Sequence, residues 1–426
     1  MLEVSKIRNQ KTIIIENLKK RGINIDKELN DLLSYDQERI SNQQIMDDLL
    51  AEGNKIAQEI GIRAKNNQLN EITPLKERAS IIKTEAKSLA EKGKLIEDKI
   101  IKILINIPNV PNEKVPIGKT AKDNAIELEW GESIEKDDLK PHWDLAEKYQ
   151  IIDFKKGAQI TGSGFPLYKG RGAQLQRGLI NFFLDFNIAA NYEEYRPPYF
   201  VNEESAFNTG QIPDKEGMMY HMENDNLYAI PTAEVPITNI FRNTKLLADD
   251  LPIKCTAYSP CFRREAGSYG KEVRGLNRLH QFDKVEIVQI CQPSNSYKAL
   301  NEMVDHVSIL LKKLNLKFRI VKLCGGDLGH TSALTYDFEV YAEAQKKWLE
   351  VSSVSNFETY QSNRLNLKFV DNNKKNVLCH TLNGSALALP RIMAAIIEKN
   401  QTKDGILIPK ALSQYVPFNK ITNIKL

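Results

Sequence analysis

The 426-residue sequence predicts an α+β protein in which a long helical hairpin precedes a domain built on a mainly antiparallel sheet. Two observations predict this fold class. In the first quarter of the chain, apolar residues recur in steps of three and four, which is typical of a coiled-coil seam. After about residue 140, amphipathic helices mix with strands, without the regular strand–helix–strand order of a doubly wound sheet.

The hairpin is predicted from two seams separated by a turn. The clearer seam, in the second helix, consists of Leu75, Ala79, Ile82, Ala86, Leu89, Gly93, Ile96, Ile100 and Ile103. A weaker seam within about Glu28 to Ala64 consists of Met46, Leu49, Gly53, Ile56 and Ile60. Because the intervening NNQLNEITP carries the polar residues and proline of a turn, the helices should pack antiparallel, with arms of roughly 40 to 55 Å.

The two helices of the hairpin differ in charge, since the first is rich in acidic residues and the second in lysine. One interpretation is a solvated coiled coil whose charges pair arm with arm. The other is an RNA-binding arm that contacts phosphates and recognises the shape of a helical RNA. In the second interpretation the candidate contacts are Lys76, Arg78, Lys83 and Lys87.

Proline and polar residues without a sustained period fill the stretch after the hairpin, IPNVPNEKVPIGKTAKDNAIELEWG. Such a composition is typical of a linker. We therefore expect a helical hairpin domain over 1–105, a linker over 106–135 and a second, larger domain over 136–426.

Two strands are predicted at Ile253 to Phe262 and at Gln281 to Ile290, from β-branched residues and alternating polarity. The loop between them contains three glycines and the basic residues Arg263, Arg264, Lys271, Arg274 and Arg278. Guanidinium groups suit phosphates and carboxylates, and the nearby Glu265 and Glu286 suit an ammonium group. The loop therefore predicts a site for a small zwitterion and a nucleotide; an ordinary hairpin with a solvated basic tip is the alternative.

The stretch from Ser259 reads SPCFRREAGSYGKEVRGLNRLHQFDKVEIVQI. It resembles motif 2 of the class II aminoacyl-tRNA synthetases, and specifically that of the bacterial seryl-tRNA synthetases, whose wording FRxEAGSYG…RGLxRxHQFDKVE it follows. NYEEYRPPYFV resembles motif 1, TLNGSALALPR resembles motif 3, and TAE at 232 and EVSS at 350 match two further family segments. The resemblance covers essentially the entire chain.

This resemblance implies a class II catalytic domain, with an antiparallel sheet flanked by helices, behind the hairpin. It implies a serine–tRNA ligase that uses ATP and Mg²⁺ to form seryl-adenylate and then transfers serine to the 3′ end of tRNA(Ser), and also of tRNA(Sec). It further implies a cytoplasmic homodimer whose interface includes Pro198 of motif 1.

The resemblance also implies a role for each site residue. The serine-binding residues would be Thr232, Ala233, Glu234, Arg263, Glu286, Thr381 and Ser385. The ATP-binding residues would be Arg263, Arg264, Glu265, Leu279, Phe282, Glu350, Val351, Ser352, Ser353 and Arg391. Of these, Arg263, Glu265 and Arg391 would be catalytic, and Glu350 and Ser353 would hold Mg²⁺ on the ATP.

Some of these residues have a simpler interpretation as well. Thr232 to Glu234 fits a helix N-terminus, Phe282 fits core packing, and Glu350 fits a buried partner of an arginine. Which of Glu234 and Glu286 contacts the amino group of serine, and which the hydroxyl, stays open.

The sequence departs from the family pattern at three positions. Asn191 replaces the usual glycine of motif 1, but asparagine tolerates a left-handed backbone, so the turn can survive. Gly164 in TGSGF stands where arginine is common, and Ala386 stands where glycine is frequent.

Composition excludes several other classes of protein. The formal net charge is only +4, so RNA binding would depend on local patches. No apolar run is long enough for a membrane span, and the start of the chain does not have the pattern of a signal peptide. Five cysteines without a CxxC pair predict reduced, mostly buried thiols and no structural zinc.

Two other functions are alternatives to the ligase. A synthetase paralogue that activates an amino acid for a carrier protein would share the catalytic motifs, but such truncated relatives lack a tRNA-reading arm. A non-catalytic coiled-coil tRNA-binding protein would require the charged constellation of motif 2 to be coincidental.

Overall fold

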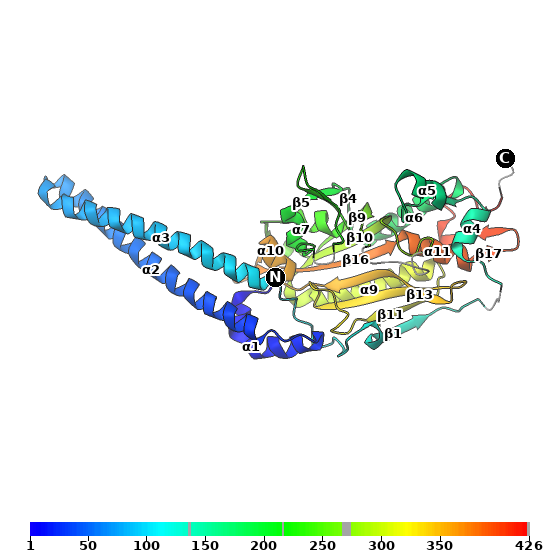
Figure 1. The fold of residues 1–426 in the computed structure, drawn as a ribbon, viewed down its shortest axis with the longest axis horizontal. Helices are drawn as coiled ribbons and strands as arrows, with labels where there is room; N and C mark the ends of the chain where they lie inside the picture. The colour runs from blue at the N-terminus through cyan, green and yellow to red at the C-terminus, as the bar shows by residue number, and fades with distance from the viewer. Residues whose placement is uncertain (135–137, 215–216, 266–273, 424–426) are drawn as a thin grey trace. The chain divides into compact units, whose positions relative to one another are not determined.

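The computed structural model describes residues 1–134, 138–214, 217–265 and 274–423, except the side chain of Leu69. They form two compact units (Figure 1). One unit consists of Leu2–Glu16 and Asn24–Pro108; the other consists of Met1, Asn17–Ile23 and Asn109–Leu426.

The first unit is dominated by the predicted hairpin, formed by α2 (Asp26–Lys65) and α3 (Ile72–Leu104), which run side by side in Figure 1. All the predicted seam positions are buried or half-buried. At Gly93 an added Cβ would lie 3.3 Å from Nδ2 of Asn42, so glycine permits the close approach. That amide donates a hydrogen bond of 2.9 Å to the carbonyl of Leu89 across the hairpin. The hairpin prediction is confirmed.

Ion pairs join the two helices of the hairpin. The guanidinium of Arg78 donates to both carboxylate oxygens of Glu52, at 2.7 and 2.8 Å, and Lys92 lies 3.1 Å from Glu38. By contrast, Lys76, Lys83 and Lys87 are exposed on α3. Part of the charge difference therefore pairs arm with arm, as the first interpretation expects, and three of the four candidate RNA contacts face solvent.

The second unit is built on an eight-stranded sheet in the order β1-β11-β12-β13-β16-β10-β9-β4. Every neighbouring pair is antiparallel except β4 and β9, which are parallel. The strands are β1 (Ala125–Trp130), β11 (Phe318–Lys322), β12 (Leu334–Ala342), β13 (Lys347–Asn356), β16 (His380–Ala388), β10 (Gln281–Cys291), β9 (Ile253–Phe262) and β4 (Glu193–Tyr195). The predicted mainly antiparallel sheet is confirmed. Edge strand β1 lies within the segment that the sequence analysis assigned to a linker.

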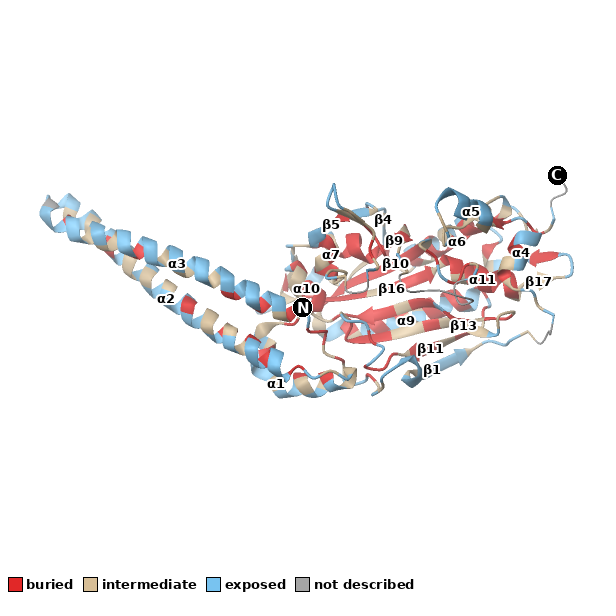
Figure 2. Ribbon diagram, viewed as in Figure 1, coloured by how far each residue is buried: buried red, intermediate tan, exposed pale blue. Residues whose placement is uncertain are grey.

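Helices α6 (Arg171–Ile188), α9 (Ser296–Lys313) and α11 (Leu389–Lys399) pack on the sheet and form its main core. Val285 and Ile287 of β10 belong to this core, whereas Val288 and Ile290 belong to a smaller core that includes Ala233. Because side chains alternate along a strand, β10 presents Glu286 on the face away from the main core. Figure 2 shows the buried interior of the sheet.

Most of α1 (Val4–Leu18) belongs to the first unit, with the hairpin. The shorter helices of the second unit are α4 (His142–Lys148), α5 (Phe154–Ile160), α7 (Glu203–Thr209), α8 (Glu234–Asn239) and α10 (Tyr360–Leu365). Within the described residues, four small sheets accompany the large one. The first pairs β2 (Ile152–Asp153) with β3 (Leu167–Tyr168), and the second has the order β5 (Phe200–Asn202), β7 (Leu227–Ala229), β6 (His221–Met222). The third has the order β15 (Asn376–Leu378), β14 (Lys368–Val370), β8 (Lys245–Leu247), and the fourth has the order β17 (Gln401–Thr402), β18 (Gly405–Leu407), β19 (Lys420–Ile421).

The departures from the family pattern have visible backbone consequences. Asn191 has φ +64°, the left-handed conformation that its replacement of glycine requires. Gly164 has φ +82°, and an added Cβ would lie 2.3 Å from the ring of His280. A side chain at 164 would therefore require the backbone or that ring to move.

All five cysteines are buried and free, as expected. Burial raises the pKa values of Cys255, Cys291 and Cys379 to about 12, so these thiols stay protonated at neutral pH. No helix within the described residues is long and apolar enough to cross a membrane.

Candidate functional site

Strands β10 and β16 place a row of polar side chains on one face of the sheet. Glu286 lies directly opposite Ser385 in the register of the two strands, and both side chains are buried. Thr381, Asn383 and Ser385 alternate along β16 and therefore share this face. The sequence motifs of residues 259–290 and 381–391 meet here.

Glu286 is the centre of this polar row. Its Oε2 accepts a hydrogen bond of 2.8 Å from the hydroxyl of Thr232 and lies 2.5 Å from the ammonium of Lys284. Its Oε1 is buried and has no hydrogen-bond partner among the described residues. A buried acceptor without a donor is costly, so this oxygen is suited to receive a ligand N–H or O–H group.

Glu234, at the start of α8, is a second buried carboxylate at the site. Its two oxygens accept hydrogen bonds of 2.7 Å from Gln361 and 2.6 Å from Asn383. The hydroxyl of Thr381 donates to Gln361 in turn, at 2.7 Å. Burial, together with the neighbouring charge of Glu286, raises the pKa of Glu234 to about 7. The pair therefore concentrates negative charge where a cationic group would relieve it.

The remaining residues of the TAE segment have structural contacts. The backbone N–H of Glu234, the first residue of α8, donates to the Thr232 hydroxyl at 3.2 Å. The segment therefore lies at a helix N-terminus, as the simpler interpretation expects, although the N-cap residue is Ala233 and makes no side-chain capping bond. The same hydroxyl also donates to Glu286, so Thr232 joins helix α8 to the carboxylate site. Ala233 is fully buried in the smaller core.

Arg263 follows β9 and lies at the rim of the site. Its guanidinium carbon is 5.3 Å from the ring centroid of Phe282, and its Nε donates to the carbonyl of Pro231 at 3.4 Å. Phe282 is half-buried and packs partly against the main core, so the core-packing interpretation accounts for part of its surface. The other part lies against a cation.

Arg391, near the start of α11, lies close to several of the charged residues that are predicted to bind ATP. Its Nε donates to the carbonyl of Asn277 at 2.9 Å, and its Nη1 donates to the carbonyl of Glu350 at 2.7 Å. Burial lowers the pKa of Arg391, and the carboxylate of Glu350 opposes this effect. Arg263 and Glu265 also act on this pKa, so four predicted ATP-site residues share one electrostatic neighbourhood. The Glu350 side chain is exposed, which does not fit the alternative of a buried partner.

The other charged residues of the motif 2 region lie close by. Glu265 has φ +48° and its carboxylate lies 3.1 Å from Nε of Arg278, a residue that was named only as part of the basic loop. Arg264 instead lies 5.2 Å from the ring centroid of Tyr220, and it donates to the carbonyl of Met219 at 2.9 Å. Lys271 and the loop glycines at 267 and 270 lie outside the described residues.

Three residues predicted to contact ATP lie in or against the main core. Leu279 and Val351 are buried members of its hydrophobic cluster. The hydroxyl of Ser352 donates to the carbonyl of Ser385 at 2.6 Å. The structure therefore gives these three residues packing and backbone contacts, whereas Ser353, the next residue along β13, is half-buried.

Asp337 of β12 adds an acidic group beside Ser353 and Glu350. It is the register partner of Ser353 across the two strands, and its Oδ1 is buried without a hydrogen-bond partner among the described residues. Burial and the charge of Glu350 raise the pKa of Asp337. Hard carboxylate oxygens of this kind fit a magnesium ion, although no group of three His, Cys, Asp or Glu side chains in the described ranges could hold a metal by itself.

Sequence reasoning did not assign several residues that the fold brings to the site. Asn383 could have been found, because it alternates between the predicted Thr381 and Ser385 on one strand. Lys284 likewise precedes Glu286 by two residues on β10. Gln361 and Asp337 come from other elements, and nothing in their local sequence pointed to the carboxylate site.

Two family models match the sequence. The seryl-tRNA synthetase N-terminal domain matches residues 1–111. The class II tRNA synthetase core domain of the glycine, histidine, proline, serine and threonine enzymes matches residues 219–400.

Curated relatives match over nearly their whole length. A serine–tRNA ligase of Salinibacter ruber is 44% identical over 424 residues, which cover 99% of both chains. A serine–tRNA ligase of Methylacidiphilum infernorum is 43% identical over 420 residues, which cover 97% of this chain and 99% of the relative.

Solved structures agree with the fold. Seryl-tRNA synthetase of Pyrococcus horikoshii, complexed with ATP, is 32% identical and superposes with a TM-score of 0.90 over all of both chains. Prolyl-tRNA synthetase of Giardia lamblia is 13% identical, with a TM-score of 0.56 over 63% of this chain and 54% of that chain, and shows only a shared fold.

Proposed function

Since this chain belongs to the seryl-tRNA synthetase family, we propose that it activates L-serine with ATP and then transfers the serine to the 3′ end of tRNA(Ser). The observation that carries this function is the buried Oε1 of Glu286, which lacks a hydrogen-bond partner among the described residues. The other oxygen of this carboxylate accepts from Thr232, and Glu286 pairs with Ser385 across the two strands. A small ligand with donors for buried carboxylates would satisfy it.

The serine pocket is proposed to use both carboxylates. Glu286 and Glu234 accept hydrogen bonds from the ammonium and hydroxyl groups of serine, and Thr232, Thr381 and Ser385 line the pocket. A pocket that hydrogen-bonds the substrate hydroxyl discriminates against alanine, because alanine would leave buried polar groups unpaired. The hydrogen bonds of Gln361 and Asn383 to Glu234 support a fixed orientation of this acceptor.

The arginines are proposed to align the reactants for the first step. The carboxylate of serine attacks the α-phosphorus of ATP, the bond to diphosphate breaks, and seryl-adenylate forms. Arg263 binds the serine carboxylate and the α-phosphate, and Arg391 binds the γ-phosphate. Glu265 and Phe282 position the adenosine. The attacking carboxylate is already ionised, so alignment and charge stabilisation suffice without a general base.

A magnesium ion is proposed at Glu350 and Ser353. The buried, unpartnered oxygen of the neighbouring Asp337 supports this location, because it adds negative charge that a divalent cation would neutralise. When bound, the ion would neutralise charge on the triphosphate.

The hairpin is proposed to bind the tRNA that accepts serine in the second step. Lys76, Lys83 and Lys87 are exposed and would contact phosphates, whereas Arg78 would first have to leave Glu52. A ribose hydroxyl of the tRNA 3′ end attacks the carbonyl of seryl-adenylate, and AMP leaves. We include tRNA(Sec) as a second substrate, because contacts to phosphates recognise shape.

We further propose a cytoplasmic homodimer with motif 1 at its interface. Part of motif 1 forms β4, an edge strand of the large sheet, which supports this location. The match to serine–tRNA ligases extends over both the hairpin and the catalytic domain. A carrier-protein synthetase without a tRNA-reading arm is therefore disfavoured.

The decisive experiment is amino-acid-dependent exchange of labelled pyrophosphate into ATP, with magnesium and without tRNA, for serine, threonine, alanine and glycine. We expect exchange with serine. Glu286→Gln should abolish most of it, while Glu302→Gln, the same substitution at an exposed position of α9, should not.

The outcomes separate the candidate functions. Exchange with serine followed by charging of tRNA(Ser) supports the ligase. Exchange without charging of tRNA would favour a carrier-protein synthetase, and absence of exchange with every amino acid would favour a tRNA-binding protein without catalysis.

A further inference from the structure

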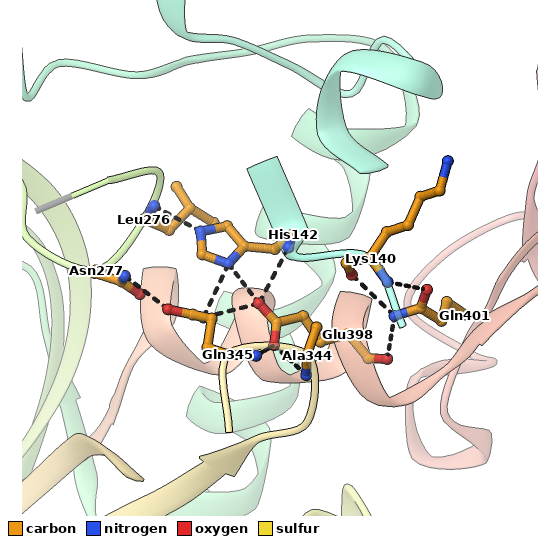
Figure 3. A network of polar contacts seen from close by, with 8 residues as sticks. All are labelled: Lys140, His142, Leu276, Asn277, Ala344, Gln345, Glu398 and Gln401. Atoms are coloured by element: carbon orange, nitrogen blue, oxygen red, sulfur yellow. Dashed lines mark hydrogen bonds and ion pairs between the residues drawn. The ribbon is translucent and has the colours of Figure 1, made fainter. Parts of the chain in front are cut away.

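A buried histidine–carboxylate pair lies next to the proposed ATP site, and neither of its residues belongs to the family motifs. The side chains of His142, at the start of α4, and Glu398, near the end of α11, are both fully buried. Nδ1 of the imidazole lies 2.8 Å from Oε1 of the carboxylate (Figure 3). Nε2 accepts a hydrogen bond of 2.9 Å from the backbone N–H of Leu276. Since Nε2 needs its lone pair for this bond, Nδ1 carries the proton and donates to Glu398.

The carboxylate of Glu398 collects donors from a second segment, the turn between β12 and β13. The backbone N–H groups of Ala344 and Gln345 donate to Oε2 at 3.0 and 3.4 Å, and the Gln345 amide donates to Oε1 at 2.8 Å. Burial alone would raise the pKa of Glu398, but the hydrogen bonds from His142 and Gln345 lower it overall. The group is therefore a buried, multiply bonded anion.

The network reaches the ATP site through Asn277. Its side-chain amide donates to Oε1 of Gln345 at 2.9 Å, while its backbone carbonyl accepts the bond from Nε of Arg391. Arg391 and Glu398 are seven residues apart on α11, so they lie on one face of the helix. Hydrogen bonds thus connect Arg391 to Asn277, Asn277 to Gln345, and Gln345 to Glu398. Helix α11, which carries both Arg391 and Glu398, closes this ring of contacts.

Several features of this ring distinguish it from ordinary core packing. Two residues before Asn277, Gly275 has φ +69°, and an added Cβ would lie 2.3 Å from Nε2 of His142, so only glycine permits this approach. Replacing buried ionic groups with apolar ones is often neutral or stabilising, so a buried pair is weak evidence of a stability role. Arg391 donates two hydrogen bonds to described residues, and both acceptors are backbone carbonyl oxygens. A guanidinium has five N–H groups, so the other three can donate to a phosphate.

We propose that His142, Gln345 and Glu398 are positioning residues for ATP: they fix the backbone of Leu276 and Asn277, whose carbonyl oxygen holds Arg391. The inference rests on the proposed function, in which Arg391 binds the γ-phosphate. None of the three residues belongs to the proposed serine or ATP contacts. Their effect acts through Arg391 and is therefore specific to ATP.

Two substitutions of His142 separate its two hydrogen bonds. His142→Gln places an amide oxygen near the position of Nε2 and keeps an acceptor for Leu276. His142→Asn places its amide near Nδ1, keeps the bond to Glu398 and loses that acceptor. In pyrophosphate exchange, we expect His142→Asn to raise the KM for ATP about tenfold, with the KM for serine within about twofold of the wild type. We expect His142→Gln to stay within about threefold of the wild type for ATP.

The coupling to Arg391 is tested with a double variant. In the Arg391→Ala background, His142→Asn should have no further effect on the KM for ATP, because the residue it positions is gone. His221→Asn, the same substitution at a half-buried histidine of β6, is the control and should leave both KM values unchanged. If His142 were merely structural, both of its substitutions would instead lower the midpoint temperature of thermal unfolding and kcat, and neither would change the KM for ATP.

A second variant covers the case in which His142→Asn does not fold. Gln345→Ala removes the link from Asn277 to Glu398 and should raise the KM for ATP about threefold. If the wild-type protein exchanges pyrophosphate with serine but the folded variants keep the KM for ATP, the positioning inference is wrong and the proposed function stands. If the wild-type protein shows no exchange, the proposed function itself is wrong.

Discussion

Two acidic side chains share one buried site, and this is the least ordinary feature of the molecule at the level of single residues. Glu234 and Glu286 are both at least 94% buried, and each charge disfavours the other. Polar partners stabilise both carboxylates. Glu234 accepts hydrogen bonds from Gln361 and Asn383. Glu286 accepts a hydrogen bond from Thr232 and forms an ion pair with Lys284. A serine ammonium group would complete this stabilisation.

The shifted pKa of Glu234 predicts a pH dependence of serine binding. With its pKa at about 7, the fraction ionised falls about tenfold between pH 8 and pH 6. The KM for serine should therefore rise by up to about tenfold over this range, while the KM for ATP should change less. Pyrophosphate exchange at several pH values checks this, and Glu234→Gln should flatten the profile.

The same pKa sets the sign of a stability effect. The folded-state pKa lies above the ordinary value of 4.5, so the native protein binds this proton more tightly than the unfolded chain. The stability that Glu234 contributes is fully present below about pH 4.5 and is lost as the pH rises through about 7. In chemical denaturation between pH 5 and pH 8, Glu234→Gln should therefore stabilise the protein more at pH 8; an equal effect at both pH values would contradict the shift.

Arg391 offers a second test at a single side chain. Arg391→Ala should raise the KM for ATP in pyrophosphate exchange by about tenfold or more, because a charge-assisted phosphate contact is lost. Circular dichroism should show an intact fold. A grossly unfolded variant would mean that the bonds of Arg391 to Asn277 and Glu350 are chiefly structural.

At the scale of secondary-structure elements, some charged residues of the hairpin form ion pairs between its two helices, and others are exposed to solvent. Arg78 is bound to Glu52 within the hairpin, whereas Lys83 and Lys87 are exposed one turn apart on α3. Exposed lysines on one helix face would release counterions when they contact RNA phosphates.

The double substitution Lys83→Ala and Lys87→Ala should therefore weaken tRNA charging and reduce its dependence on salt, without affecting pyrophosphate exchange. The KM for tRNA should rise about tenfold at physiological salt. Lys55→Ala, at an exposed lysine of α2, serves as the control. An unchanged KM for tRNA would place the RNA contacts elsewhere on the protein.

The molecule as a whole consists of two compact units, and the catalytic motifs belong to one of them. Deletion of 28–103, with a short flexible connection in its place, should leave serine activation largely intact and abolish tRNA charging. Pyrophosphate exchange and aminoacylation measured on the same preparation check this. Loss of exchange in a folded deletion variant would show that the hairpin is needed for activation.

The sequence alone determined the main helices and strands, and it supplied the candidate site residues. The three- and four-residue steps predicted α2 and α3, and alternation predicted most of β10, because the backbone repeats impose these periods on any half-buried segment. The richness of 253–262 in β-branched and aromatic residues predicted β9. The family motifs predicted Arg263, Glu286 and Arg391 as site residues. In the fold, Arg263 lies beside Phe282 of β10, and Arg391 contacts the carbonyl oxygens of Asn277 and Glu350.

Only the tertiary structure decided which residues meet across elements distant in the chain. Gln361 reaches Glu234 from α10, Asp337 lies beside Ser353 through strand pairing, and His142 meets Glu398 across 256 residues. Local periodicity carries no signal for such contacts, because they depend on strand order and helix packing. For the same reason, Leu279 and Val351 lie in the core although their segments match the motifs.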